Sequence, residues 1–155
     1  MSLRDIASRS KRGDKSSKGR HGRLLTVKEI KRIRRRGYRA ERELVGRLRN
    51  LGYNSVRVPV SAPSSEPLPD VFATKNNCIL AFEVKAPNAE RAYFRSDQIK
   101  KLFDFLEMFK VYHMKYAVLA AKFPYRWVFK KVEAIGDYVL EKSEADNMKL
   151  EFVNG

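Results

Sequence analysis

Two carboxylates and an amine stand at matching ends of a predicted β-hairpin in the middle of the chain. Residues 69–85 read PDVFATKNNCILAFEVK, with Asp70 opening the first strand and Glu83 and Lys85 closing the second. Because side chains alternate along a strand, Glu83 and Lys85 point to one face at one end. The short turn at 75–77 makes the two strands antiparallel neighbours and returns Asp70 to that end.

These residue types suit one kind of chemistry. Carboxylate oxygens are the ligands that Mg²⁺ prefers, and this ion takes one or two of them together with water and phosphate oxygens. A lysine beside such a site can orient or deprotonate a metal-bound water, or neutralise charge that develops on phosphate. The pattern therefore indicates metal-assisted hydrolysis of a phosphodiester.

The same three charges also have a structural interpretation, a salt bridge between Lys85 and Asp70 or Glu83 at the end of a strand. Short matches of this type are common, and most of them arise from such pairs. The spacing suits a single hairpin and the chain is strongly basic, which favours the catalytic interpretation here.

The surrounding sequence predicts a mixed β-sheet with helices packed against it. The segment TVKE at 26–29 has the form of a capping box and predicts a basic helical turn, which Gly37 interrupts. Apolar periodicity predicts helices and strands elsewhere. The helices span about 39–51 and 96–110, and the strands span 53–60, the two arms of the hairpin, 116–123 and 127–132. This α-β-β-β-α-β-β order is typical of an α/β domain.

Charge is the strongest compositional signal. The 155 residues carry a formal net charge of +15, and residues 1–36 hold 14 Lys/Arg against 3 Asp/Glu. Such a segment attracts polyanions, because each phosphate contact releases counterions. We expect residues 1–23 to be a disordered basic arm and residues 24–155 to be the folded domain.

Several classes of protein do not fit the sequence. We expect no membrane span, since no run of about 18 apolar residues occurs, and the first residues lack the apolar stretch of a secretory signal. A single cysteine, Cys78, cannot form an internal disulfide and fits an intracellular setting. No Cys/His spacing for zinc and no glycine-rich phosphate loop is present.

The arrangement resembles a known nuclease motif. Pro69-Asp70 followed by Glu83-Val84-Lys85 is similar to the PD-(D/E)xK motif, and the flanking sequence resembles the archaeal Holliday junction resolvases. The resemblance runs from residue 34 to about 110 through RRGYRAERELVGRLRNLGYNSVRVPVSA and PLPDVFATKNNCILAFEVK. It implies a restriction-endonuclease-like fold and an Mg²⁺-dependent endodeoxyribonuclease, with Mn²⁺ as a substitute.

The resemblance also implies roles for single residues. Glu41 takes the place of the first-helix glutamate, Ser61 that of a loop serine near the scissile phosphate, and Lys85 that of the catalytic lysine. The metal ligands would be Glu41, Asp70, Glu83 and the backbone carbonyl of Val84. The family commonly has glycine after the loop serine, where this sequence has Ala62. On composition alone, Ser61 would be an ordinary turn serine and Glu41 a surface ion-pair partner.

Further residues are expected to bind DNA, namely Arg34, Arg35, Arg36, Arg57 and Gln98. A four-way junction presents two symmetric scissile strands, so the resemblance implies a homodimer acting on branched DNA in the cytoplasm, associated with the nucleoid. Two rival hypotheses stay open. One is a nuclease of the same superfamily that cuts flaps or duplex DNA, and the other is a catalytically silent DNA-binding protein.

Overall fold

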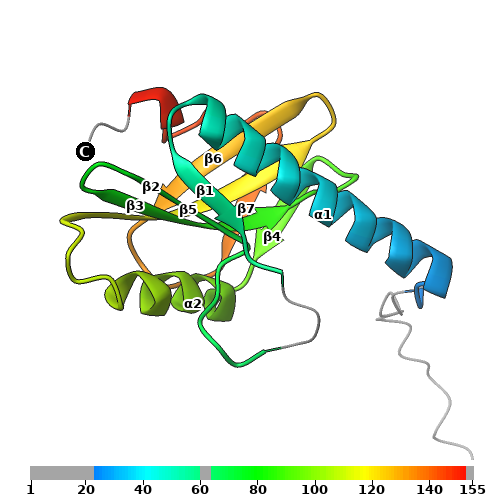
Figure 1. The fold of residues 1–155 in the computed structure, drawn as a ribbon. Coiled ribbons are helices and arrows are strands. Elements are labelled where there is room, and N and C mark those ends of the chain that lie inside the picture. Colours follow the sequence, from blue (N-terminus) through cyan, green and yellow to red (C-terminus); the bar gives the residue numbers. More distant parts are fainter. Residues whose placement is uncertain (1–22, 60–63, 153–155) are drawn as a thin grey trace, which may run out of the picture.

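The computed structural model describes residues 23–59 and 64–152 of the chain, which form two α-helices, seven strands and a 3₁₀ turn. The elements in chain order are α1 (Val27–Asn50), β1 (Asn54–Arg57), β2 (Val71–Lys75), β3 (Cys78–Lys85), β4 (Arg91–Phe94), α2 (Ser96–Glu107), β5 (Met114–Phe123), β6 (Arg126–Val132), β7 (Tyr138–Glu141) and a 3₁₀ turn (Leu150–Phe152). Figure 1 shows the main sheet with α1 and α2 on opposite sides of it. No helix in the described ranges is long and apolar enough to cross a membrane.

The main sheet is mixed, as the sequence predicts. Its five strands follow the order β1-β2-β3-β5-β6, in which β3 and β5 are parallel and the other neighbours are antiparallel. The parallel pair is joined through β4 and α2, which provide the crossover connection that parallel strands require. The central position of β3 explains its nearly continuous apolar sequence, because both of its faces are covered.

Alternation along β3 assigns its side chains to two separate cores. Cys78, Leu80 and Phe82 pack on the α1 side, with the apolar face of that helix. Ile79 and Ala81 pack on the α2 side, with residues of that helix and of β5 and β6. The same alternation places Glu83 and Lys85 on the α2 side at the end of the strand.

One sequence prediction about α1 is wrong. The helix runs without interruption from Val27 to Asn50, so Gly37 does not break it. The capping box forms as predicted, since the Glu29 amide donates to Thr26 Oγ1 at 3.2 Å and Glu29 Oε2 accepts from the Thr26 amide at 2.7 Å. A glycine costs about 1 kcal/mol relative to alanine in a helix, which is too little to end a long, capped helix.

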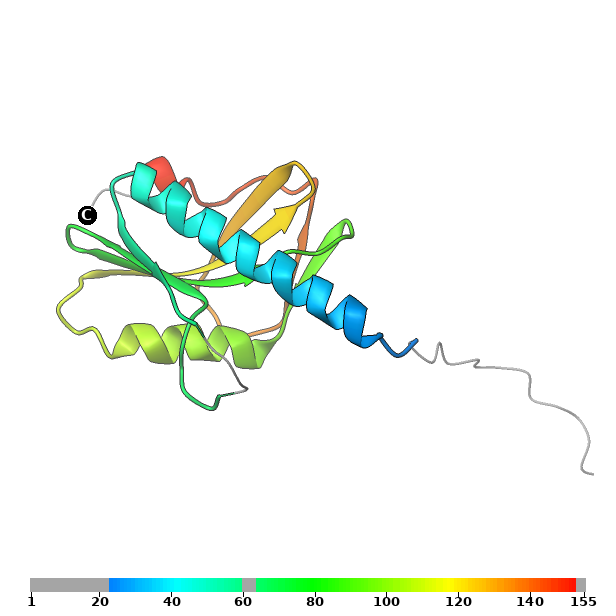
Figure 2. The same cartoon turned by 45° about the vertical axis from the view of Figure 1, so that its right-hand side comes forward.

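Other boundaries also differ from the predictions. β4 and β7 form a two-stranded antiparallel sheet that periodicity did not indicate, since each strand has only four residues. α2 ends at Glu107 rather than 110, and β1 ends at Arg57 rather than at residue 60. The N-terminal half of α1 extends beyond the sheet (Figures 1 and 2). The predicted arm lies outside the described residues except for Arg23, which precedes α1.

Candidate active site

The hairpin brings Asp70, Glu83 and Lys85 to one end of the sheet. β2 and β3 pair with Val71 opposite Phe82, and one further step along this register sets Asp70 beside Glu83. The Asp70 amide donates to the Phe82 carbonyl at 3.0 Å, and the Val84 amide donates to Asp70 Oδ2 at 2.7 Å. The carboxylate of Asp70 is therefore fixed by the backbone of the strand that carries the other two groups.

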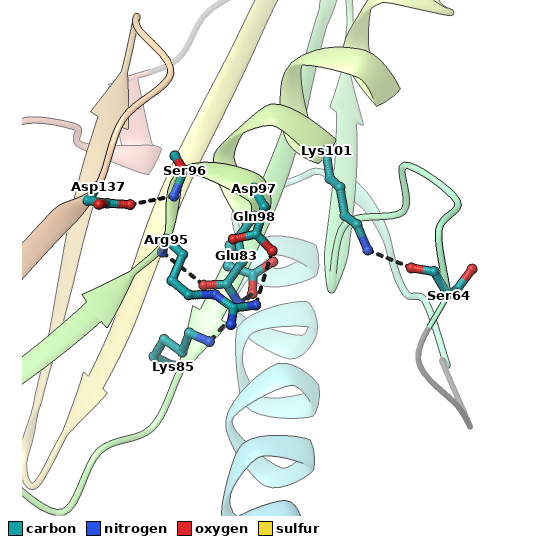
Figure 3. Close-up of polar contacts among 9 residues, drawn as sticks. All are labelled: Ser64, Glu83, Lys85, Arg95, Ser96, Asp97, Gln98, Lys101 and Asp137. Atoms are coloured by element: carbon teal, nitrogen blue, oxygen red, sulfur yellow. Dashed lines mark hydrogen bonds and ion pairs between the residues drawn. The ribbon is translucent and has the colours of Figure 1, made fainter.

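Glu83 is held between β3 and the start of α2. Its Oε1 accepts a hydrogen bond from Gln98 Nε2 at 2.7 Å and lies 3.7 Å from Lys85 Nζ. Figure 3 shows Lys85 reaching toward Glu83 from the strand end while Gln98 reaches it from the helix. Gln98, which is expected from the sequence to bind DNA, holds Glu83 through its side-chain amide.

The start of α2 is itself fixed from a distant part of the chain. The Ser96 amide donates to Asp137 Oδ1 at 2.7 Å, and the Arg95 amide donates to Gln98 Oε1 at 3.1 Å (Figure 3). Gln98 thus uses its carbonyl on the helix start and its amino group on Glu83. The positive end of the helix dipole faces the region of this carboxylate.

Glu41 belongs to α1 and has a different partner. It is 9% exposed, and its Oε2 accepts a charge-assisted hydrogen bond from Arg57 Nε. The guanidinium of Arg57 also lies 4.5 Å from the centre of the Tyr38 ring. The surface ion pair that composition alone indicated for Glu41 is replaced by this half-buried pair with Arg57. Glu43, on the same helix, accepts hydrogen bonds from Lys122 and Trp127.

The electrostatics show that the three carboxyl groups sense one another. The pKa of Glu83 is raised to about 8, chiefly by burial and also by the charge of Asp70, while Lys85 and Lys101 oppose the rise. Burial also raises the pKa of Asp70, against the hydrogen bond from the Val84 amide. Burial raises the pKa of Glu41, against its bond to Arg57. A site that gathers buried like charges in this way favours a cation.

The donor set fits an ion that needs few protein ligands. Within residues 23–59 and 64–152, no group of three or more acidic, histidine or cysteine side chains lies together so that it could hold a metal. Asp70 and Glu83 form a pair, and Glu41 stands apart from them with Arg57. Two carboxylates, completed by water and phosphate oxygens, match the coordination that Mg²⁺ takes in proteins.

The predicted DNA-binding residues have different surroundings. Arg34 and Arg35 are exposed on the projecting half of α1. Arg36 is half-buried, and its Nε donates to the Ala86 carbonyl at 2.7 Å, directly after Lys85. Ser61 falls in residues 60–63, outside the described residues.

Some functional contacts were missed by sequence reasoning. Lys101 donates through Nζ to the Ser64 carbonyl at 2.6 Å, and its charge acts on Glu83. It therefore ties α2 to the segment before β2 (Figure 3). Its position on the helix, one turn after Gln98, is a signal that could have identified it. The contribution of Asp137 has no local signal, because it comes from the connection between β6 and β7.

Comparisons with known proteins agree on one family. Residues 32–154 match the family model of the archaeal Holliday junction resolvases. The chain is 41% identical over 102 residues to crossover junction endodeoxyribonuclease Hje of Saccharolobus islandicus, covering 64% of this chain and 76% of that protein. It is 43% identical over 101 residues to Hje of Sulfolobus acidocaldarius, covering 64% and 71%.

A solved structure gives the same result. Hjc of Archaeoglobus fulgidus, a Holliday junction resolvase, superposes with a TM-score of 0.58 at 28% identity, covering 69% of this chain and 89% of Hjc. The chain belongs to the archaeal Holliday junction resolvase family.

Proposed function

We propose that this protein is an Mg²⁺-dependent endodeoxyribonuclease that resolves four-way DNA junctions by paired symmetric nicks. The observation that carries the proposal is the convergence of Asp70, Glu83 and Lys85 at one end of the β2–β3 hairpin. Membership of the resolvase family supports the substrate, and the relatives at 41% and 43% identity are named crossover junction endodeoxyribonucleases.

Asp70, Glu83 and the carbonyl of Val84 would hold a divalent ion, and Mn²⁺ would substitute for Mg²⁺. The family supports a divalent metal in general, and the hard oxygen donors support Mg²⁺ in particular. When bound, the ion supplies Lewis-acid activation of the phosphate and of a water. Glu41 is proposed as an outer member of the set, since its charge reaches Asp70 although its own contact is to Arg57.

The side chains of this protein have separate tasks in the reaction. Lys85 is 34% exposed in its side chain and lies beside Glu83, so its ammonium can reach both a nucleophilic water and the charge that develops on the phosphate. Gln98 fixes the orientation of Glu83. Ser61, which lies outside the described residues, is proposed to contact the scissile phosphate.

Cations of α1 are proposed to hold the DNA backbone. Arg34 and Arg35 are exposed on the projecting half of the helix, and Arg36 lies next to the segment after Lys85. Arg57 donates to Glu41 through Nε, and its remaining guanidinium donors can contact a phosphate.

Removal of residues 1–23 should weaken DNA binding and reduce the slope of affinity against salt concentration, because that slope counts phosphate contacts. An unchanged slope would show that the arm does not contact DNA.

A homodimer is part of the proposal, because two symmetric strands must be cut. α2 buries Ile99, Leu102, Phe105 and Leu106 but leaves Met108 58% exposed just beyond its end, and Val111 follows at 79%. An apolar surface of this kind suits a two-fold contact. The protein would act in the cytoplasm with the nucleoid, where its substrate is found.

The decisive experiment compares DNA substrates and variants. Purified protein is incubated with Mg²⁺ and a synthetic four-way junction, a flap or a matched duplex. We expect paired symmetric cuts in the junction and little cutting of the other two. Asp70→Asn should stop cutting yet still bind the junction, whereas Asp104→Asn, an exposed carboxylate paired with Lys100, should cut normally. Retained cutting by Asp70→Asn would refute the site, and equal cutting of the duplex would refute the substrate.

A further inference from the structure

The turn between β5 and β6 holds an aromatic residue in an unusual setting. Tyr125 has φ of 64°, in the left-handed region, and its side chain is completely exposed, with a relative accessibility of 102%. It follows Pro124 at the tip of a hairpin whose last paired residues are Phe123 and Arg126. The ring gains no burial within the described part of the protein.

The β2–β3 hairpin in the same sheet shows which residue type usually occupies the left-handed position of such a turn. In the β2–β3 turn the left-handed residue is Asn76, with φ of 52°. Asparagine and glycine adopt this conformation readily, whereas a bulky side chain adopts it rarely and at a cost. Folding alone would therefore favour asparagine or glycine at 125, and residues held in strained conformations are concentrated at functional sites.

The turn lies at the same end of the sheet as the active site. β3 and β5 are parallel, and Lys85 stands opposite Ala121. β5 then continues for two residues to Phe123 before the turn, so Tyr125 projects beyond the end that carries Glu83 and Lys85. At about 3.3 Å per residue, the two additional residues of β5 extend the strand by the length of one or two nucleotides along DNA.

The surroundings of Tyr125 are cationic. A cavity of about 200 Å³ lies between α1, the segment after β3 and this turn, and Tyr125 forms part of its lining together with Arg36, Arg39 and Lys122. The one carboxylate in the lining, Glu43, accepts hydrogen bonds from Lys122 at 2.7 Å and from Trp127 at 2.8 Å. In Figures 1 and 2 the β5–β6 turn lies beside the middle of α1, which carries the two arginines.

This combination has a specific ligand chemistry. Guanidinium and ammonium groups bind phosphates, while an exposed ring offers a stacking surface to any nucleobase. Bases inside a continuous duplex are already stacked, but stacking is interrupted where strands exchange, so a base there is exposed at little cost. We propose that Tyr125 stacks on a nucleobase at the branch point while Arg36, Arg39 and Lys122 hold adjacent phosphates. The inference rests on the proposed function and identifies a residue that distinguishes junctions from duplex DNA.

The test measures binding without cleavage. All variants are made in the full chain carrying Asp70→Asn, and affinity is measured for a synthetic junction with the fluorescent base 2-aminopurine at the branch and for a matched duplex. Tyr125→Asn removes the ring while suiting the backbone, so it should melt at or above the temperature of its parent. It should bind the junction about tenfold more weakly and the duplex unchanged, in keeping with the loss of one stacked base.

Two further variants complete the comparison. Tyr125→Phe should keep the junction affinity and the change in 2-aminopurine emission on binding, and Tyr125→Asn should lose that change. Ile135→Asn, which alters an exposed apolar residue in the β6–β7 connection, should behave as its parent. Junction affinity unchanged in Tyr125→Asn, or lost equally for junction and duplex, would overturn the inference while the proposed function stands. A parent protein that does not prefer the junction to the duplex would overturn both.

Discussion

The two ends of β3 lie in the same sheet between the same helices, yet they hold opposite chemistry. From Cys78 to Phe82 every side chain is buried and neutral. The next three residues end the strand with Glu83 and Lys85, and a second carboxylate, Asp70, lies beside them. The first end stabilises the fold, while the second gathers buried carboxyl groups whose ionisation opposes folding. The difference shows that the hairpin is a rigid support for a costly site.

The largest expected effect comes from neutralising Glu83 at the charged end of β3, which comprises residues 83–85. Glu83→Gln should slow junction cutting about 1000-fold, because an interaction of several kcal/mol with the metal and phosphate is lost. The same change should raise the free energy of unfolding without metal by about 1 kcal/mol, since the amide needs neither a proton nor a buried charge when the protein folds. Single-turnover cutting with Mg²⁺ and urea unfolding with EDTA measure the two effects.

The exposed pair partner Glu107 supplies a matched control for that variant. Glu107→Gln removes the same charge at the end of α2, where Lys110 is its partner. It should change neither cutting nor stability by much, because exposed pairs contribute little. If Glu83→Gln were less stable than the parent, the charged end would be contributing to the fold and the comparison would fail.

Truncation at the apolar end should have the reverse outcome. Leu80 is completely buried on the α1 side of β3. Leu80→Ala should lower the free energy of unfolding by about 3 kcal/mol through the cavity that it leaves. Cutting per folded molecule should stay near the parent rate at a temperature where the variant is folded. Leu80→Met, which keeps the volume, should cost about 1 kcal/mol or less. A large loss of activity in the folded variant would show that the two ends are not independent.

Breaking the hydrogen bond between α2 and the charged end of β3 should have an intermediate effect on cutting. Gln98→Ala removes the hydrogen bond that holds Glu83 at 2.7 Å. Since partners that orient a ligand typically contribute 10- to 100-fold, cutting should fall about tenfold and more Mg²⁺ should be needed for half of the maximal rate. A titration of rate against Mg²⁺ separates this role from a structural one, because a helix-stability defect would leave the Mg²⁺ requirement unchanged.

The apolar end was the part of the fold that sequence predicted best. Alternation and apolar runs located the hairpin, and helical periodicity located α2, because local pattern and tertiary burial agree there. β4 and β7 were missed because four residues are too few for a period to appear, and each strand is stabilised by a partner about 50 residues away. The break at Gly37 was predicted from a local preference that the caps of the long helix override.

The candidate site was likewise predicted only in part from the sequence. Spacing alone brought Asp70, Glu83 and Lys85 together, since strand geometry is regular enough to fix their positions. It could not show that Arg57 is the partner of Glu41, because that contact depends on how α1 crosses the sheet. The contacts of Gln98 and Asp137 likewise depend on where α2 begins in space, which no local pattern records.

The smallest expected effect tests whether burial at the apolar end of β3 opposes ionisation of the Cys78 thiol. Burial raises the pKa of the Cys78 thiol from 9.0 to about 11. The folded state therefore holds its proton at a pH where the unfolded state releases it, so the contribution to stability is complete below pH 9 and is lost as the pH rises through 11. At pH 10 the loss should be about 1 kcal/mol.

Cys78→Ala has no thiol to titrate, so the difference in free energy of unfolding between parent and variant should shrink by that amount between pH 8 and pH 10 in urea unfolding. The pKa of Tyr53, raised to about 12 mainly by burial, is also raised by the charge of Cys78, and this smaller part is absent from the variant. A difference that stays constant with pH would mean that the apolar end accepts a thiolate, and the contrast with the charged end would then rest on geometry and not on burial.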